Sequence, residues 1–350
     1  MDDMIKILIV DDSAFMRKLL SDLFSSETDF MVIDTARNGQ DAIEKTKRLK
    51  PDLITMDVEM PIMDGITALE MIMKDIPTPV IMISSLTRDG AEATMCALEL
   101  GAVDFVAKPA GVISSIAGIG KEIVAKARVA VGVKMPKVYE KVAKVSAMIN
   151  PSLQRTTVAS DEKIVAIGTS TGGPRALQEI ITQLPGNLPC GVVIVQHMPP
   201  GFTKSLSERL NSLSSLTVKE AEHNDVIRPG LVLIAPGDYH MTIEHEGNKR
   251  IIKLNQNPPI GGHRPAVDPM MESVAKVYGQ RAVGVILTGM GHDGAKGVQA
   301  IKQQLGYTIA EDQSTAVVFG MPKSAIELGA VNKVAPLSAI AAEIVKAIIK

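Results

Sequence analysis

Residues 164–175 read Ile164-Val165-Ala166-Ile167-Gly168-Thr169-Ser170-Thr171-Gly172-Gly173-Pro174-Arg175, and this stretch decides how the second half of the chain folds. Four apolar residues lead into a glycine-rich turn, after which Leu and Ile recur at helical spacing from Pro174 onward. The order predicts a buried strand, a tight turn and a helix, because proline is tolerated in the first helical turn. Ser170 and Thr171 then lie where free backbone N–H groups and the positive end of the helix dipole favour negative charge.

Three interpretations of this turn compete. Its glycines could wrap a phosphate, but Ser170 replaces the second glycine of G-x-G-x-x-G, and no lysine follows them as in a Walker motif. The spacing Gly168-Thr169-Ser170-Thr171-Gly172 also fits G-x-S-x-G, in which the serine is a nucleophile. In the third interpretation Ser170 only caps its helix. Other parts of the chain have to decide between them.

Length, charge and cysteine content exclude several classes of protein. The chain has 350 residues, 46% hydrophobic and 22% charged, which suits two soluble globular domains. A net charge of -2 gives no reason to expect nucleic acid as a partner. The two cysteines, Cys96 and Cys190, lie far apart, as in proteins of reducing compartments. The first apolar run, Ile5–Val10, ends at two aspartates, so we expect no signal peptide, no direct membrane insertion and a cytoplasmic protein.

Residues 1–125 alternate short apolar runs with amphipathic helical patterns. Five such β–α units predict a flavodoxin-like domain with a five-stranded parallel sheet and helices on both faces. The expected strands are Ile5–Val10, Met31–Ala36, Asp52–Met56, Pro79–Ile83 and Val103–Val106.

Polar residues follow four of these strands, at the sheet edge where ligands bind in this architecture. Asp11 and Asp12 follow the first strand, Asp57 the third, Ser84 the fourth and Lys108 the fifth. Converging carboxylates repel one another unless a cation lies among them, and oxygen ligands suit Mg²⁺. Lys108 could pair with these acids or with an incoming phosphoryl group.

This whole segment resembles response-regulator receiver domains. The matching motifs are Val10-Asp11-Asp12-Ser13, Met56-Asp57-Val58-Glu59-Met60-Pro61-x-x-Asp64-Gly65, Ile83-Ser84-Ser85 and Ala107-Lys108-Pro109. The resemblance implies that Asp57 accepts a phosphoryl group from a histidine kinase, and that Ser84 and Lys108 handle it. It also implies that Asp11, Asp12, Asp57 and the backbone carbonyl of Glu59 hold Mg²⁺. Phe105 occupies the position of the aromatic switch residue, and a cis bond is expected before Pro109.

The remaining chain divides into a linker, 126–160, and a second domain, 161–350. Strand-like runs separated by helical patterns predict a doubly wound, mostly parallel α/β sheet, interrupted by a β-hairpin around Glu246-Gly247-Asn248. The expected strands are Ile164–Ile167, Cys190–Val195, Leu231–Ile234, Val283–Leu287 and Tyr307–Ala310, with a closing helix at Ser338–Lys350.

A serine nucleophile needs a base within reach and an acid that orients the base. His197 ends one predicted strand, and Asp293 follows another in Leu287-Thr288-Gly289-Met290-Gly291-His292-Asp293-Gly294. Ser170, His197 and Asp293 would therefore share one sheet edge. His263 and His292 are rival bases, while no H-E-x-x-H or comparable spacing supports a metal hydrolase.

With these motifs, and with His263-Arg264-Pro265-x-Val267-Asp268, the chain resembles the chemotaxis protein-glutamate methylesterases, which are receiver-controlled enzymes that also deamidate glutamine. The resemblance implies Ser170 as nucleophile, His197 as general base and Asp293 as orienting acid. It places the Met290 N–H in the oxyanion site and Thr171 beside the nucleophile. It also implies methyl-accepting chemoreceptors as substrates and a chemotaxis histidine kinase as phosphodonor. His292 departs from the family's usual Asn and adds a titratable ring beside Asp293.

We therefore expect hydrolysis of γ-glutamyl methyl esters without any cofactor for that step. We also expect the unphosphorylated receiver to cover the sheet edge that carries Ser170. The alternative is a phosphorylation-gated binding module that holds a nucleotide at residues 168–173.

Overall fold

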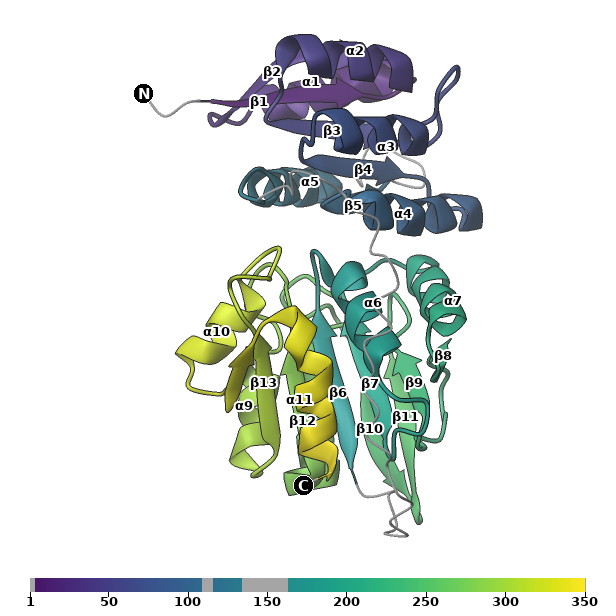
Figure 1. Ribbon diagram of the computed structural model, residues 1–350, viewed down its shortest axis with the longest axis vertical. Coiled ribbons are helices and arrows are strands. Elements are labelled where there is room, and N and C mark those ends of the chain that lie inside the picture. The colour runs from purple at the N-terminus through teal and green to yellow at the C-terminus, as the bar shows by residue number, and fades with distance from the viewer. Residues whose placement is uncertain (1–3, 109–115, 134–162, 350) are drawn as a thin grey trace.

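The computed structural model describes residues 4–108, 116–133 and 163–349, and these form two α/β units, each built on a parallel sheet (Figure 1). In the first unit the strand order is β2-β1-β3-β4-β5. Its elements are β1 (Ile5–Val10), α1 (Ala14–Ser25), β2 (Phe30–Ala36), α2 (Gly39–Leu49), β3 (Leu53–Asp57), α3 (Gly65–Asp75), β4 (Val80–Ser84), α4 (Arg88–Leu100), β5 (Asp104–Ala107) and α5 (Ile116–Val131). The five-stranded parallel sheet is thereby confirmed.

The second unit has seven parallel strands in the order β14-β13-β12-β6-β7-β9-β8 and a separate antiparallel hairpin, β10-β11. Its elements are β6 (Ile164–Thr169), α6 (Gly173–Gln183), β7 (Gly191–Gln196), α7 (Phe202–Leu213), β8 (Thr217–Glu220), β9 (Leu231–Ile234), β10 (His240–Glu246), β11 (Lys249–Asn255), α8 (Val267–Tyr278), η2 (Gly279–Arg281), β12 (Ala282–Ile286), α9 (Ala295–Gln303), β13 (Tyr307–Glu311), α10 (Met321–Glu327), β14 (Lys333–Ala335) and α11 (Leu337–Ile349). The expected sheet and hairpin are confirmed, whereas the edge strands β8 and β14 were not predicted.

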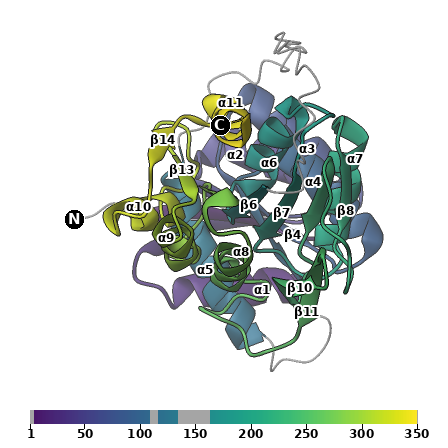
Figure 2. The ribbon, with the colours of Figure 1, turned by 90° about the horizontal axis from the view of Figure 1, so that it is seen from below.

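The side chains of β6 point alternately to the two faces of the second sheet, and each face packs against its own group of helices. Val165 and Ile167 belong to the apolar cluster under α6, α7 and α11, while Ile164 and Ala166 belong to the cluster under α8, α9 and the hairpin. Figure 2 shows these two groups of helices on opposite faces of the sheet. A strand buried on both faces has to be apolar throughout, which is why no polar residue interrupts it before Thr169.

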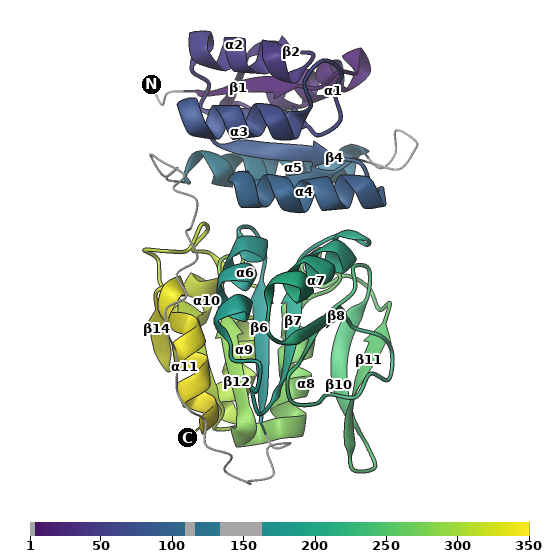
Figure 3. The ribbon, with the colours of Figure 1, turned by 45° about the vertical axis from the view of Figure 1, so that its right-hand side comes forward.

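The two units lie end to end. The α4, β5 and α5 side of the first unit faces the amino ends of α6 and α7, at the carboxyl edge of the second sheet (Figure 3). The α5 helix ends at Val131, inside the predicted linker 126–160, whose residues from 134 on lie outside the described part of the chain, as does Pro109. Among the described helices, none combines the length and the apolar character needed to cross a bilayer.

The close approach of β6 to α8 requires a glycine at position 168, since a Cβ there would overlap Val267 Cγ1. We expect Gly168→Ala to destabilise the protein by about 1–3 kcal/mol through overpacking. Adding Val267→Ala should recover much of this loss, because the two substitutions act on one contact. Urea unfolding of the two single variants and the double variant measures the coupling; additive losses would contradict the contact.

Candidate active site

The predicted nucleophile and base are neighbours because β6 and β7 pair in parallel. Thr169 lies opposite Gln196, so Ser170 and His197 are the next residues on adjacent strands. The His197 N–H donates to the Thr169 carbonyl oxygen at 3.1 Å, and the Gln196 side chain donates to the Ser170 carbonyl oxygen at 2.9 Å. Ser170 is only 9% exposed. These contacts fix both residues at one edge of the sheet.

The imidazole of His197 is joined to the carboxylate of Asp293. Nε2 lies 2.7 Å from Oδ2, and Asp293 also accepts the N–H groups of Val267 at 2.7 Å and Asp268 at 3.0 Å. Burial by itself would raise the pKa of Asp293, but the histidine and these N–H groups outweigh burial and hold the pKa below its usual value. An ionised carboxylate can only accept hydrogen bonds, so the proton of neutral His197 is on Nε2. Nδ1 is then the basic atom, and it is buried without a hydrogen-bond partner among the described residues.

The loop after β12 lies against the nucleophile. The Ser170 N–H donates to the Thr288 carbonyl oxygen at 3.0 Å, and a Cβ on Gly289 would lie 2.9 Å from Ser170 Cβ. Met290 follows directly. Within the described residues, the N–H groups of Thr171 and Met290 have no hydrogen-bond partner. Two free donors beside a serine are what an oxyanion site requires.

The side chain of Thr171 is bound by the first unit. Its hydroxyl donates to Asp104 Oδ2 at 2.5 Å, and Asp104 Oδ1 lies 3.3 Å from Lys126 Nζ. Phe105, the next residue of β5, stacks on Phe202 of α7 with ring centroids 4.6 Å apart. The expectation that the first unit covers the Ser170 edge agrees with these contacts. Asp104, Lys126 and Phe202 were not singled out from the sequence.

The acidic residues of the first unit converge as predicted. Carboxylate oxygens of Asp11, Asp12 and Asp57 lie within 4.8 Å of one another. Lys108 Nζ donates to Asp57 Oδ2 at 2.6 Å and lies 3.3 Å from Asp11 Oδ2, which has no hydrogen-bond partner among the described residues. Burial raises the pKa of Asp57 to about 6, against the hydrogen bond from Lys108. A cluster of carboxylate oxygens, with a buried oxygen of Asp11 that Lys108 approaches only to 3.3 Å, fits a hard cation such as Mg²⁺.

Two further residues predicted to act at this site, Ser84 and Glu59, have their side chains bonded elsewhere. The Ser84 hydroxyl donates to the Gly90 carbonyl oxygen at 3.0 Å, so in this state it is bonded to α4. Glu59 lies in the loop after β3, two residues beyond Asp57, and its exposed carboxylate accepts a hydrogen bond from Ser85 at 3.4 Å. The expected cis bond before Pro109 falls outside the described residues.

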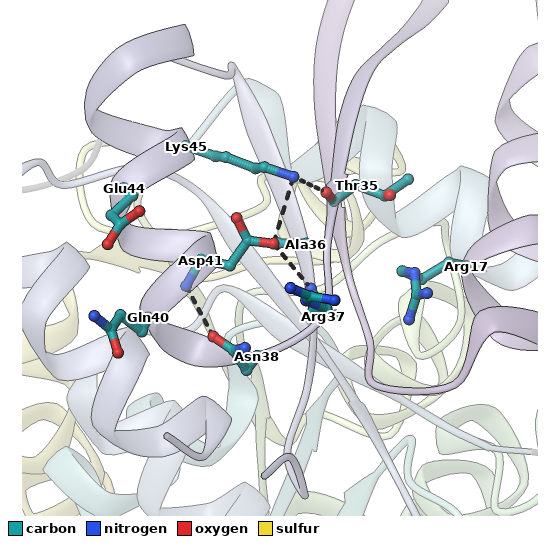
Figure 4. A pocket seen from close by; sticks show the side chains of 9 residues that line it. All are labelled: Arg17, Thr35, Ala36, Arg37, Asn38, Gln40, Asp41, Glu44 and Lys45. Atoms are coloured by element: carbon teal, nitrogen blue, oxygen red, sulfur yellow. Dashed lines mark hydrogen bonds and ion pairs between the residues drawn. The ribbon is translucent and has the colours of Figure 1, made fainter. Parts of the chain in front are cut away.

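A polar cavity of about 510 Å³ lies beside this cluster, between Arg17 and α2 (Figure 4). Arg17 Nη1 donates to the carbonyl oxygens of Asp11 at 2.8 Å and Asp12 at 2.9 Å, which holds the acidic loop in place. Across the cavity Asp41 already pairs with Lys45 at 3.4 Å. We assign this cavity no ligand.

The rival bases take different positions. The ring of His263 stacks on that of His197, whereas His292 is exposed. A further residue, Glu311, was not predicted although it ends a buried strand. It is fully buried and accepts the N–H of Thr288 at 2.8 Å, and so holds the loop that leads to Met290.

Both halves of the chain match known protein families. The sequence profile "CheB methylesterase" matches residues 165–344, and "Response regulator receiver domain" matches residues 7–115. A "Protein-glutamate methylesterase/protein-glutamine glutaminase" of Symbiobacterium thermophilum is 51% identical, over 98% of this chain and 97% of that protein. One of Pyrococcus abyssi is 48% identical, over 98% and 94%. The crystal structure of the Thermotoga maritima CheB methylesterase catalytic domain matches with a TM-score of 0.52 and 50% identity, over 53% of this chain and 98% of that one.

The free energy of unfolding should depend on pH through Glu311, because burial raises the pKa of this carboxyl group to about 7. The folded state then binds more protons than the unfolded state between about pH 4.5 and 7. This contribution to stability is present below that window and is lost as pH rises through it. Glu311→Gln should therefore lose less stability between pH 5 and 8 than the natural chain, by a few kcal/mol at most. Urea unfolding at both pH values measures the difference, with the exposed Glu327→Gln as control; equal pH dependence of all three proteins would contradict the assignment.

Proposed function

The chain belongs to the family of receiver-controlled protein-glutamate methylesterases/protein-glutamine glutaminases, and from this premise we propose how its own residues carry out and regulate the reaction. Its activity is the hydrolysis of glutamate methyl esters and the deamidation of glutamines in chemotactic adaptation, under control by phosphorylation. The proposed substrates are methyl-accepting chemoreceptors, and the proposed phosphodonor is a chemotaxis histidine kinase. The proposal for the catalytic residues rests on the 2.7 Å contact of His197 Nε2 with Asp293, one strand from Ser170.

Ser170 Oγ attacks the ester carbonyl carbon while His197 Nδ1 takes the hydroxyl proton, since Nε2 is engaged by Asp293. The N–H groups of Thr171 and Met290 stabilise the oxyanion, a contribution of about 3 kcal/mol per donor in studied hydrolases. The imidazolium returns its proton to the leaving methoxide, and methanol departs. Water activated by the same nitrogen then releases glutamate from Ser170. Deamidation follows the same route with ammonia as the leaving group.

The phosphorylation site is assigned to Asp57. We propose that Asp11, Asp12, Asp57 and the Glu59 carbonyl hold Mg²⁺, which supplies positive charge for the incoming phosphoryl group. Lys108, 2.6 Å from Asp57, and the Ser84 hydroxyl would bind its oxygens. To do so, the Ser84 hydroxyl would have to break its hydrogen bond to the Gly90 carbonyl oxygen.

The position of β5 suggests regulation in which the first unit covers the active site of the second. Asp104 holds the Thr171 hydroxyl, and Phe105 stacks on Phe202; both belong to β5, which pairs with β4, the neighbour of the strand that carries Asp57. A third contact lies at the rim, where Arg209 of α7 donates to both carboxylate oxygens of Glu99 in α4, at 2.6 and 2.8 Å. Phosphorylation that shifts β5 and α4 would loosen all three contacts.

Ser170→Ala should abolish methanol release from methylated receptor membranes, because no other hydroxyl replaces the nucleophile. The exposed Ser212→Ala is the matched control and should retain full activity. Methanol release by the Ser170 variant at the natural rate would move the nucleophile elsewhere.

Charge reversal tests regulation without touching the catalytic residues. Glu99→Arg should place two cations together and raise the unphosphorylated activity, by roughly two- to ten-fold for a pair at an exposed rim. Combining it with Arg209→Glu restores attraction and should restore the low basal rate. Methanol release is measured for each variant with and without Mg²⁺ and a small-molecule phosphodonor. Phosphorylation should raise the rate of the double variant by a larger factor than that of Glu99→Arg. Unchanged basal rates in all variants would contradict control through this interface.

A further inference from the structure

His263 lies on the catalytic histidine in a geometry that the reaction scheme above does not use. The rings of His263 and His197 are parallel, with an interplanar angle of 6° and centroids 3.8 Å apart. The edge of the His197 ring carries its bond to Asp293, so His263 covers one face and leaves that bond intact. Stacked rings at this distance restrict each other's tilt.

The loop that carries His263 is itself well anchored. Ile260 and His263 exchange two backbone hydrogen bonds of 3.0 Å across Gly261 and Gly262, which both have positive φ, as a tight two-residue turn requires. The next residue, Arg264, donates to Asp238 Oδ1 at 3.0 and 2.5 Å. It also donates to the carbonyl oxygens of Gln256 and Asn257. An anchored backbone fixes the point from which the His263 ring reaches His197, and the ring contact itself is the stack on His197.

We propose that His263 is a positioning residue, whose ring holds the His197 imidazole at the angle at which Nε2 meets Asp293 and Nδ1 is left as the free base. The proposal rests on the function assigned to Ser170 and His197 above. It distinguishes His263 from a second base, because Asp293 is hydrogen-bonded to His197 and the ring face of His263, rather than a nitrogen, meets His197.

The charge state of His263 suits this role. Burial, together with the charges of His197, Lys126 and His292, lowers the pKa of His263 to about 4, against the influence of Asp293. His263 is therefore neutral at neutral pH, when His197 becomes positively charged during the reaction. A neutral ring face tolerates that charge, whereas a protonated one would repel it.

The test compares three substitutions in the full-length protein. His263→Ala and His263→Gln remove the flat ring and should lower kcat by roughly ten- to a hundred-fold with little change in KM, since orientation rather than substrate contact is lost. His263→Phe keeps a flat ring that cannot titrate or donate, and should retain most of kcat. The exposed His245→Ala is the matched control and should behave as the natural chain.

A second readout follows the ring itself. In ¹⁵N-histidine spectra, the natural chain and His263→Phe should show His197 protonated at Nε2 alone, while His263→Ala should show both tautomers. This measurement does not depend on the receptor assay, and thermal unfolding of each variant checks that it is folded.

Two results would overturn the proposal. One is natural kcat in His263→Ala; the other is an equal loss in the Phe and Ala variants, which would assign His263 a hydrogen-bonding role. Ser170→Ala is measured in parallel. If it is inactive while His263→Ala is fully active, only the positioning role fails; if it is active, the premise fails and the inference with it.

Discussion

The parallel pairing of β6 with β7 on one side and β12 on the other is the constraint on which the rest of this structure depends. It brings Ser170, His197 and the loop after Leu287 to one edge, although they are far apart in sequence. Backbone hydrogen bonds in the sheet fix this arrangement, so the side chains need little further ordering. Asp293 then completes the contact with His197 from the start of α9, and the N–H groups at the start of α8 hold its carboxylate.

The same edge of the second sheet is also where the first unit would control the activity. Catalysis needs an accessible serine, whereas Ser170 here is only 9% exposed and its neighbour Thr171 is bonded to Asp104 of β5. Asp104 and Phe105 contact the second unit, and Lys108, three residues beyond Phe105, contacts Asp57. Within the proposed function, this short strand connects the phosphoryl acceptor to the nucleophile. A local change in charge therefore needs to travel only the length of one strand.

Several residues illustrate why sequence reasoning stopped where it did. The aspartates at the carboxyl ends of β1 and β3 were identifiable because strand order alone brings parallel carboxyl ends together. His263 was recognised as a chemically capable residue, but its stacking depends on a loop anchored through Arg264 and Asp238, which no spacing rule describes. Glu311 and Asp104 were not singled out from the sequence, because their roles depend on distant partners. Their partners, Thr288 and Thr171, lie 23 and 67 residues away.

The sequence by itself determined the two parallel sheets, most of their strands and the acidic cluster, because hydrophobic periodicity and strand-end positions are local properties. It proposed Ser170, His197 and Asp293 for catalysis only when the family resemblance was added, since strand-end positions left His263 and His292 as rival bases. Only the tertiary structure decided which histidine nitrogen faces the carboxylate, which ring lies on the base, and which residues of one unit close the site of the other. Those features depend on the packing of distant segments, and packing is set by the whole fold rather than by neighbours in the chain.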